Sequence, residues 1–254
     1  MRLRVLGCSG GISQGLRTTS MLLDDDILID AGTGVGDLSL EEMRRVDHVF
    51  LTHSHLDHVT SLPFLLDSVG GMRDSPVIVH ALDETISILK EHVFNWKLWP
   101  DFSQLPTPEK PYVRFEPIGV GETVELDGRK ITALPAHHTV PAVGYLLDSG
   151  QASLAFSGDT MDCQAFWDVL NGIGNLRYLL IETTFSDKEN GVAHASRHYF
   201  PGLLARQLPK LKQAVEIYIT HLSPGEQERI MGEVFAAVSG TSPKMLDHGH
   251  IFDF

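Results

Sequence analysis

Short apolar runs separated by turn residues fill the first part of the chain, and their spacing predicts β-strands. The first three runs are joined by glycine loops and an acidic turn, and they lie at residues 3–6, 20–23 and 27–29. A fourth run at 46–51 leads into apolar residues at helical spacing over 59–69, and this strand-then-helix order returns at 77–79 and 86–93. Four prolines between residues 96 and 112 predict a long surface loop without regular structure.

The second half repeats this organisation. Predicted strands come first, at residues 113–116, 131–134, 144–147 and 153–156. Alternation follows, with helices at 163–170, 199–208 and 225–238 and strands at 178–181 and 217–219. Because each half is a run of strands followed by strand and helix alternation, we expect an α/β fold of two mixed sheets packed face to face with helices outside. No repeat or linker divides the chain, so we expect a single domain over residues 1–254.

The charge balance argues against a broad surface for nucleic acid. Acidic residues number 33 and basic residues 20, giving a formal net charge of −13, whereas neutralising backbone phosphates requires many Lys and Arg. The two cysteines, Cys8 and Cys163, are too few for a disulfide framework. The N-terminal residues lack the apolar stretch of a signal peptide, and no run approaches the roughly 18 apolar residues of a membrane span. We therefore expect a cytoplasmic protein that binds neither nucleic acid nor membrane.

The chain is rich in histidine, with 13 in 254 residues, and several of them are clustered. Thr-His-Ser-His-Leu-Asp-His at 52–58 places three imidazoles and a carboxylate directly after a predicted strand. In extended backbone, positions i and i+2 project to the same side, so His53 and His55 can converge on one ion. As the chain turns into the next helix, Asp57 and His58 are offset enough to serve a neighbouring ion. The segment therefore predicts part of a dinuclear metal site.

Further ligands must come from other strand ends. Asp159 follows the apolar strand at 153–156, where a carboxylate is suited to bridging two cations, with a helix cap as the alternative. His221 follows the strand at 217–219 in the same way. His137 and His138 follow the strand at 131–134; we expect one of them to be a ligand and the other structural, and spacing alone leaves open which. Zn²⁺ is the expected metal, with Mn²⁺ or Fe as alternatives for imidazole and carboxylate ligands.

Taken in chain order, these residues resemble the metallo-β-lactamase superfamily. The motif at 52–58, followed by His138, Asp159 and His221, carries the resemblance, and Gly-Cys-Ser-Gly-Gly at 7–11 and Leu-Ile-Asp-Ala-Gly at 28–32 extend it. The resemblance implies the four-layered αβ/βα sandwich of that superfamily. It also implies one metal ion on His53, His55 and His138, a second on Asp57, His58 and His221, and Asp159 as the bridge. His138 is preferred over His137 because its spacing to Gly144 and Tyr145 matches the family.

Within the superfamily, the chain resembles the class II 3′,5′-cyclic-nucleotide phosphodiesterases. The motifs concerned are those at 53–62, at 92–95 with Trp-Pro at 99–100, at 181–185 and at 198–201. The resemblance implies hydrolysis of cAMP, with cGMP as a second candidate, to the 5′-nucleotide by a hydroxide that the metal ions activate. Asp57 is expected among the catalytic residues.

A proton donor is expected to assist departure of the ribose oxygen, since an alkoxide leaves poorly. His198 is the first candidate by resemblance and His194 the second, and either can instead be an ordinary surface histidine. Asp30 and Glu182 can orient ligand histidines, or lie solvated at strand ends.

Substrate contacts are expected from Asn95 and Trp99 in the proline-rich segment, together with His198. Asn95 can instead cap a turn. The aromatic residues there can instead anchor the loop, and these are Phe94, Trp96, Trp99 and Phe102.

Two classes of alternative stay open. Another hydrolase of the same fold would use the same ligands: an endonuclease that matures transfer RNA 3′ ends, a sulfatase or a lactonase. The acidic net charge argues against the endonuclease. A non-catalytic metal- or nucleotide-binding module is the other alternative, and the full set of seven ligands argues against it. The expected partner is a small cyclic nucleotide, and a homodimer stays open.

Overall fold

The apolar runs of the first half form one mixed sheet of seven strands in the computed structural model, which describes residues 1–254. In spatial order the strands are β16 (Ile251–Asp253), β1 (Arg2–Gly7), β2 (Ser20–Leu23), β3 (Ile27–Ile29), β4 (His48–Phe50), β5 (Val77–Ala81) and β8 (Val113–Pro117). The first four are antiparallel, and β3, β4, β5 and β8 run parallel.

The second half forms a second seven-stranded sheet. In spatial order it contains β15 (Lys244–Met245), β14 (Glu216–Thr220), β13 (Leu176–Glu182), β12 (Ser153–Phe156), β11 (Val143–Asp148), β10 (Arg129–Pro135) and β9 (Thr123–Leu126). Strands β12 to β15 are parallel, whereas β9 to β12 are antiparallel. Both sheets are therefore mixed, as expected.

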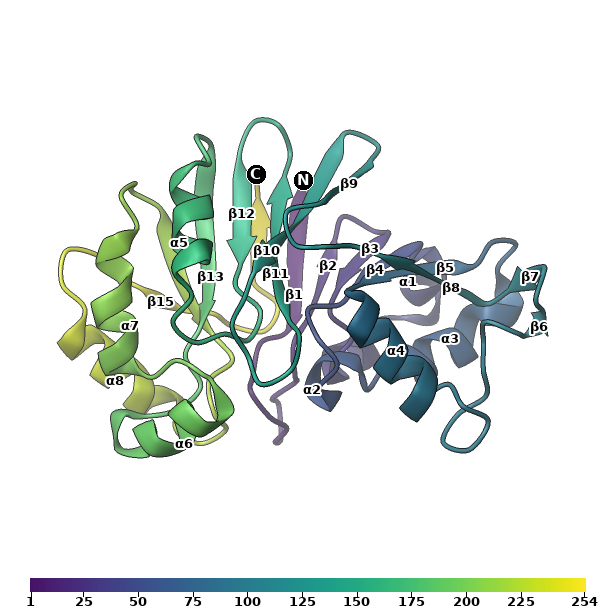
Figure 1. The fold of residues 1–254 in the computed structure, drawn as a ribbon, viewed down its shortest axis with the longest axis horizontal. Helices are drawn as coiled ribbons and strands as arrows, with labels where there is room; N and C mark the ends of the chain where they lie inside the picture. Colours follow the sequence, from purple (N-terminus) through teal and green to yellow (C-terminus); the bar gives the residue numbers. More distant parts are fainter.

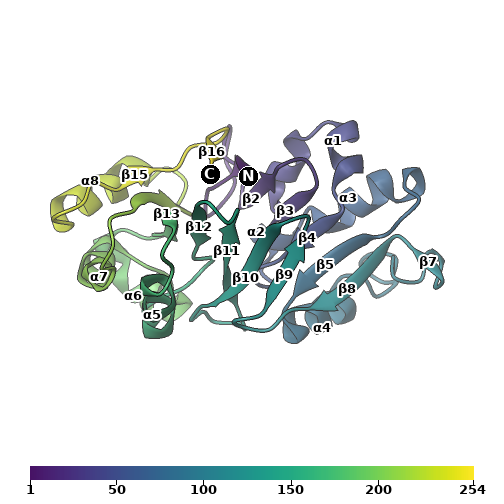
Figure 2. The same cartoon turned by 90° about the horizontal axis from the view of Figure 1, so that it is seen from above.

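Helices cover the outer face of each sheet (Figures 1 and 2). The helices on the first sheet are α1 (Leu40–Arg45), α2 (Leu56–Val59), α3 (Leu62–Val69) and α4 (Asp83–His92). Those on the second are α5 (Gln164–Asn171), α6 (Asn190–Ser196), α7 (Pro201–Gln207) and α8 (Gln227–Ala237). The four layers confirm the expected fold class. No helix is long and apolar enough to span a bilayer.

Three apolar cores separate the four layers, and strand alternation distributes side chains between them. In β3, Ile27 and Ile29 enter the core between the sheets, whereas Leu28 packs towards the helices of the first sheet. The hydroxyl of Tyr145 in the second sheet donates a 2.8 Å hydrogen bond to the carbonyl of Leu51 in the first. This buried bond fixes the sheets relative to each other where their strands end.

Several elements of the structure differ from the predicted ones in length or number. The helix expected over 59–69 is two helices, because the chain breaks at Thr60 and Ser61, and Pro63 then occupies the first turn of α3, where its missing N–H costs nothing. The loop at 96–112 contains a small hairpin of β6 (Pro106–Thr107) and β7 (Lys110–Pro111), although no regular structure was expected there. The short or exposed elements α1, α6, β9, β15 and β16 were not predicted.

A histidine pair, His80 buried and His48 partly exposed, joins β4 and β5. Nδ1 of His48 lies 3.0 Å from Nε2 of His80, and the His80 ring stacks on Phe50 at 4.4 Å between centroids. Burial, followed by the neighbouring His48, lowers the pKa of His80 to about 4. The folded protein therefore favours neutral His80.

We predict that His80 makes stability fall as the solution is acidified. Its folded pKa lies below the unfolded value of about 6.5, so its contribution is present above pH 6.5 and is lost towards pH 4, by about 2–3 kcal/mol. Urea unfolding of the metal-free protein between pH 7 and pH 4 measures this. The slope with pH should be shallower in His80→Phe and unchanged in His92→Phe, whose ring is exposed. Equal slopes in wild type and His80→Phe would contradict the prediction.

Candidate metal centre

Carboxyl ends of parallel strands meet along one edge of the molecule, at the bottom of Figure 1 between α2 and α6. His53 follows β4 in the first sheet, while Asp159 and His221 follow β12 and β14 in the second. His138 follows β10, which runs in the same direction as β12 because both are antiparallel to β11. The topology therefore brings residues more than 160 positions apart to one edge.

Three histidines form the first donor group. Ligand atoms of His53, His55 and His138 lie within 4.8 Å of one another. Nε2 of His138 is 3.2 Å from Nδ1 of His55, and the rings of His53 and His138 meet edge to face at 4.9 Å. His55 is the N-cap of α2 in extended backbone, which aims its side chain to the same side as His53.

A second donor group lies beside the first and contains Asp57, His58, Asp159 and His221, again within 4.8 Å of one another. Nε2 of His221 is 3.1 Å from Oδ2 of Asp57 and 3.3 Å from Nε2 of His58. Asp57 and His58 enter from the single turn of α2, whereas His221 holds a left-handed backbone with φ of 61°. Its N–H donates to the carbonyl of Cys8, which stabilises that uncommon conformation.

Asp159 lies between the two groups. Its Oδ2 is 3.7 Å from His53 Nε2, 3.3 Å from His58 Nε2 and 3.4 Å from His221 Nε2. Gly158 sets this position with φ of 58°, and a Cβ there would lie 2.6 Å from the carbonyl of Val143. A side chain at residue 158 would therefore displace Asp159.

Two buried polar atoms in the centre have no hydrogen-bond partner, Nε2 of His53 and Oδ1 of Asp159. Buried polar groups are normally paired, because an unpaired group loses its solvation without compensation. A cluster of imidazole and carboxylate lone pairs with unpaired members inside it fits divalent cations in chemistry and in number. The His and Asp clusters are thus consistent with a dinuclear metal site.

The electrostatics favour the metal-binding forms of two central residues. Burial, followed by His58, lowers the pKa of His53 well below its usual value, so this imidazole is neutral and keeps a lone pair. Although burial opposes its charge, His221 and His58 hold the pKa of Asp159 well below its usual value. The carboxylate is therefore ionised at neutral pH.

Asp30 and Thr52 orient two of the histidines from the first sheet. Thr52 Oγ1 donates to the Asp30 carboxylate at 2.9 Å and lies 3.0 Å from Nδ1 of His53. Since the hydroxyl proton is used on Asp30, Oγ1 accepts from His53 Nδ1–H, which leaves the lone pair on Nε2. His58 Nδ1–H donates to Asp30 at 2.7 Å, which directs Nε2 towards the second donor group.

Glu182 and Thr184 form the corresponding pair at the end of the second sheet. Thr184 Oγ1 donates to Glu182 at 3.1 Å and lies 2.9 Å from Nδ1 of His221, so it accepts from His221 and leaves Nε2 free. His198 Nδ1 is 2.9 Å from the same carboxylate, so its Nε2 is its remaining ligating atom. A ligating atom of His198 also lies within 4.8 Å of those of His138 and Asp159.

A family comparison agrees with this geometry. The model of the beta-lactamase superfamily domain matches residues 25–233, most of the chain. The protein belongs to the metallo-β-lactamase superfamily. Its His and Asp donors are those of a metal-dependent hydrolase of this superfamily.

Two sequence relatives and one solved structure give the range of similarity within the superfamily. A probable 3′,5′-cyclic-nucleotide phosphodiesterase of Yersinia pestis is 24% identical, covering 88% of this chain and 78% of the relative. Ribonuclease Z of Bradyrhizobium diazoefficiens is 25% identical over 98% of both chains. The crystal structure of unliganded yeast PDE1 superposes with a TM-score of 0.81 at 15% identity, covering 100% of this chain and 99% of that one. The last likeness concerns the fold alone.

Two histidines that the sequence offered as a metal ligand or a proton donor lie outside the donor groups. His137 is exposed beside the buried His138, so the register of β10 selects the second of the pair. His194 is exposed on α6, packs against Phe200 and belongs to no donor group. Glu182 is buried, contacts His198 directly and reaches His221 through Thr184, which agrees with the expectation that it orients a ligand histidine and not with a solvated strand end.

The proline-rich segment contains Asn95 and Trp99. Asn95 Nδ2 donates to the Glu91 carbonyl, and its Oδ1 accepts from the N–H groups of Lys97 and Leu98. These bonds are those of the turn cap that was the alternative to a substrate contact. Trp99 is partly buried against Phe64, with ring centroids 5.2 Å apart.

Sequence reasoning missed Thr52, Thr184 and Gly10 as supporting residues. A Cβ at Gly10 would lie 2.7 Å from the carbonyl and 3.0 Å from Nδ1 of His221, so only glycine fits there. Gly10 and Thr184 lie in motifs at 7–11 and 181–185 that the resemblance includes, which was the available signal.

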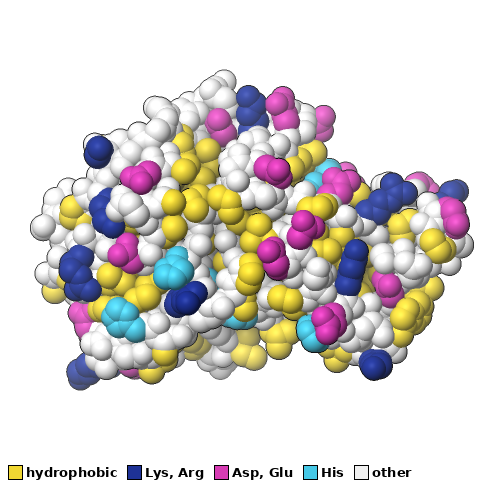
Figure 3. Space-filling model, in the orientation of Figure 1, with side chains coloured by type: hydrophobic (Ala, Val, Ile, Leu, Met, Phe, Trp, Pro, Cys, Tyr) yellow, Lys and Arg dark blue, Asp and Glu magenta, His cyan; other side chains and the backbone are white.

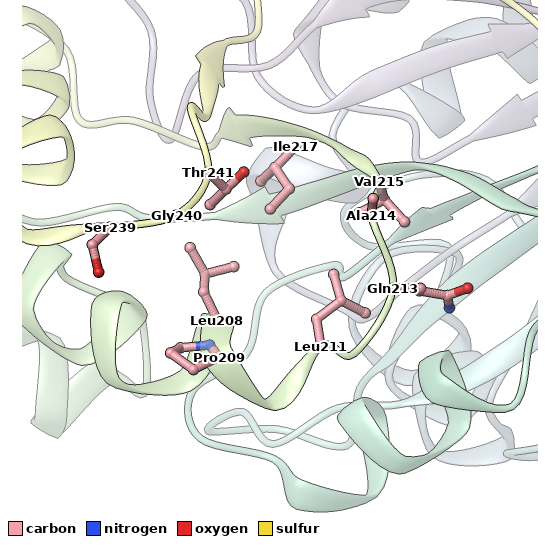
Figure 4. Close-up of a pocket in the computed structure, with 10 residues that line it drawn as sticks. All are labelled: Leu208, Pro209, Leu211, Gln213, Ala214, Val215, Ile217, Ser239, Gly240 and Thr241. Atoms are coloured by element: carbon pink, nitrogen blue, oxygen red, sulfur yellow. The ribbon is translucent and has the colours of Figure 1, made fainter.

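A separate cavity of about 280 Å³ lies at the opposite end of β14, near its first residues (Figure 4). Its lining contains no acidic, basic, histidine or cysteine side chain. It therefore offers no group for metal binding or acid–base chemistry.

We predict that the protein binds two Zn²⁺ ions and that Asp159→Asn loses at least one of them, because Asp159 contacts both donor groups. Metal content after dialysis, measured by mass spectrometry, tests this, and Zn²⁺ should also raise Tm through preferential binding to the folded state. The matched variant Asp127→Asn changes an exposed turn and should keep both ions. Two ions bound with unchanged affinity in Asp159→Asn would contradict the prediction.

Proposed function

We propose that this protein is a dinuclear metal-dependent phosphodiesterase that hydrolyses 3′,5′-cyclic nucleotides to 5′-nucleotides. The observation that carries the proposal is the placement of His198, a buried imidazole held by Glu182 directly beside a complete dinuclear donor set. The similarity to a probable 3′,5′-cyclic-nucleotide phosphodiesterase supports the choice of substrate.

The residues of the two donor groups divide the binding task. His53, His55 and His138 would hold one ion, Asp57, His58 and His221 the other, and Asp159 would contact both. Divalent ions bound there supply the positive charge that attracts a phosphodiester and lower the pKa of water to near 7. Asp30, Thr52 and Thr184 fix the imidazole tautomers, so the donors are oriented before any substrate arrives.

His198 would donate the proton that the leaving ribose oxygen requires. Although burial favours its neutral form, the adjacent Glu182 carboxylate raises the pKa of His198 to about 9. In the metal-free protein this carboxylate therefore favours the protonated imidazole. Because Nδ1 is bonded to Glu182, the proton available to substrate is the one on Nε2.

The charge distribution supports a small substrate over RNA. The chain carries a formal net charge of −13, and in Figure 3 the Lys and Arg side chains occur singly or in small groups among acidic ones. A polynucleotide would need a continuous basic surface. The full-length similarity to ribonuclease Z makes RNA 3′-end cleavage the second candidate.

Substrate profiling of the zinc-loaded protein tests the assignment. We expect conversion of cAMP to 5′-AMP, and little or no turnover of precursor transfer RNA, an aryl sulfate or a lactone. The position of the phosphate in the product, read by chromatography, identifies the bond that breaks. Cleavage of precursor RNA without hydrolysis of cyclic nucleotides would favour the second candidate instead.

We predict that His198→Gln lowers kcat for cAMP by about 10²–10⁴, the range typical of a lost general acid. The same variant should lower kcat for bis(p-nitrophenyl) phosphate by less than about tenfold, because p-nitrophenolate leaves without a proton. Steady-state rates on both esters measure the difference.

His194→Gln serves as the comparison for this variant. It should leave both rates within about twofold, since His194 is exposed and outside the donor groups. An equal loss on both esters in His198→Gln would show that His198 acts on metal binding or structure and not as a proton donor.

A further inference from the structure

An apolar pocket of about 240 Å³ lies beside the candidate metal centre, between α2, α3 and the segment after α4. We call it the α2 pocket, and it is lined by Leu56, Val59, Thr60, Pro63, Phe64, Val93, Leu98 and Trp99. None of these residues belongs to the donor groups.

The α2 pocket and the metal centre occupy different faces of the same turn of helix. Leu56, Val59 and Thr60 are spaced i, i+3 and i+4, so they share one face and line the pocket. Asp57 and His58 lie between them in sequence and turn towards the donor cluster. Leu56 of the lining lies between the donor residues His55 and Asp57 in sequence, so the pocket begins one residue away from the donor cluster.

Aromatic and aliphatic side chains form the open rim of the pocket. Phe64 and Trp99 meet edge to face at an interplanar angle of 72°, and Leu56, Phe64 and Leu98 are 69%, 58% and 65% exposed. Contiguous exposed apolar side chains are unfavourable in water unless a ligand covers them. The segment that carries Trp99 is held by the hydrogen bonds of Asn95 and by the buried rings of Phe94 and Phe102. The pocket is thus formed in advance of binding.

The size and chemistry of the pocket restrict its occupant. Its volume is below the roughly 300–1,000 Å³ of sites that enclose a whole drug-sized ligand, so it accommodates one ring system. Thr60 is the one lining residue with a polar side chain besides Trp99, whose Nε1 is buried. The walls therefore offer stacking and apolar contact and few hydrogen bonds.

We infer that the α2 pocket is the subsite for the base of the substrate and that it recognises the base by its flat shape and not by its polar edge. The inference rests on the proposed phosphodiesterase function. A site that hydrogen-bonds a polar edge rejects analogues strongly, whereas an apolar wall discriminates weakly. The enzyme should accordingly accept adenine and guanine about equally.

Kinetics on a base-free substrate isolates this subsite. We compare cAMP, cGMP and the cyclic phosphate of methyl ribofuranoside, which keeps the sugar and phosphate and lacks the base. In wild type, kcat/KM should differ by less than about threefold between cAMP and cGMP and be at least about tenfold lower without the base.

Phe64→Ala should lower kcat/KM for cAMP by about tenfold and leave the base-free ester within about twofold. Phe235→Ala is the matched control, because Phe235 is also 58% exposed but lies on α8 in the other half of the molecule. Equal effects of Phe64→Ala on both esters, or a preference above about a hundredfold between cAMP and cGMP, would overturn the inference and leave the phosphodiesterase assignment intact.

A binding measurement decides the matter without turnover. Titrating the zinc-loaded protein with 5′-AMP should quench Trp99 fluorescence saturably, and the signal should be absent in Trp99→Phe. Phe64→Ala should weaken the apparent affinity by about tenfold, with Phe235→Ala unchanged. If no ester is hydrolysed but quenching follows this pattern, the phosphodiesterase assignment fails and the ring subsite stands. If AMP produces no quenching of Trp99, the subsite is refuted.

Discussion

The repulsion and desolvation of lone pairs at one sheet edge is the constraint on which this structure depends. Seven imidazole and carboxylate groups lie close together there, and two of their buried atoms have no partner in the protein. Such an arrangement is unfavourable by itself, since the two unpaired atoms have lost water without gaining a hydrogen bond. Backbone features that are themselves costly hold it in place, including the left-handed residues Asp30 and His221.

Two carboxylate–threonine pairs make the arrangement specific. Asp30 with Thr52 fixes His53 and His58 from the first sheet, and Glu182 with Thr184 fixes His198 and His221 from the second. In each pair the carboxylate only accepts hydrogen bonds, so the threonine hydroxyl donates to it. The same hydroxyl then accepts from Nδ1–H of the neighbouring imidazole, which fixes the position of the ring proton. Two buried carboxylates outside the donor groups, Asp30 and Glu182, therefore set the tautomers at the centre.

The sequence was sufficient for the fold class and for local spacing, and insufficient where tertiary contacts decide. The motif at 52–58 carries its own geometry, because i and i+2 positions share a side and α2 starts within it. The choice of His138 over His137 required the family resemblance, since it depends on the register of β10. Thr184 and Gly10 support the site through contacts with His221, which is distant from both in the sequence. Strand β9 was missed because half of its residues are exposed and it lacks a strong apolar pattern.

The division of donors between the sheets has a mechanical consequence. The first sheet and α2 supply His53, His55, Asp57 and His58, and the second sheet supplies His138, Asp159 and His221. Neither half alone offers a complete coordination shell. A motion that separates the two halves would weaken both coordination spheres together. Metal loss should therefore be cooperative with separation of the halves. Bound ions would act as a cross-link between the two sheets.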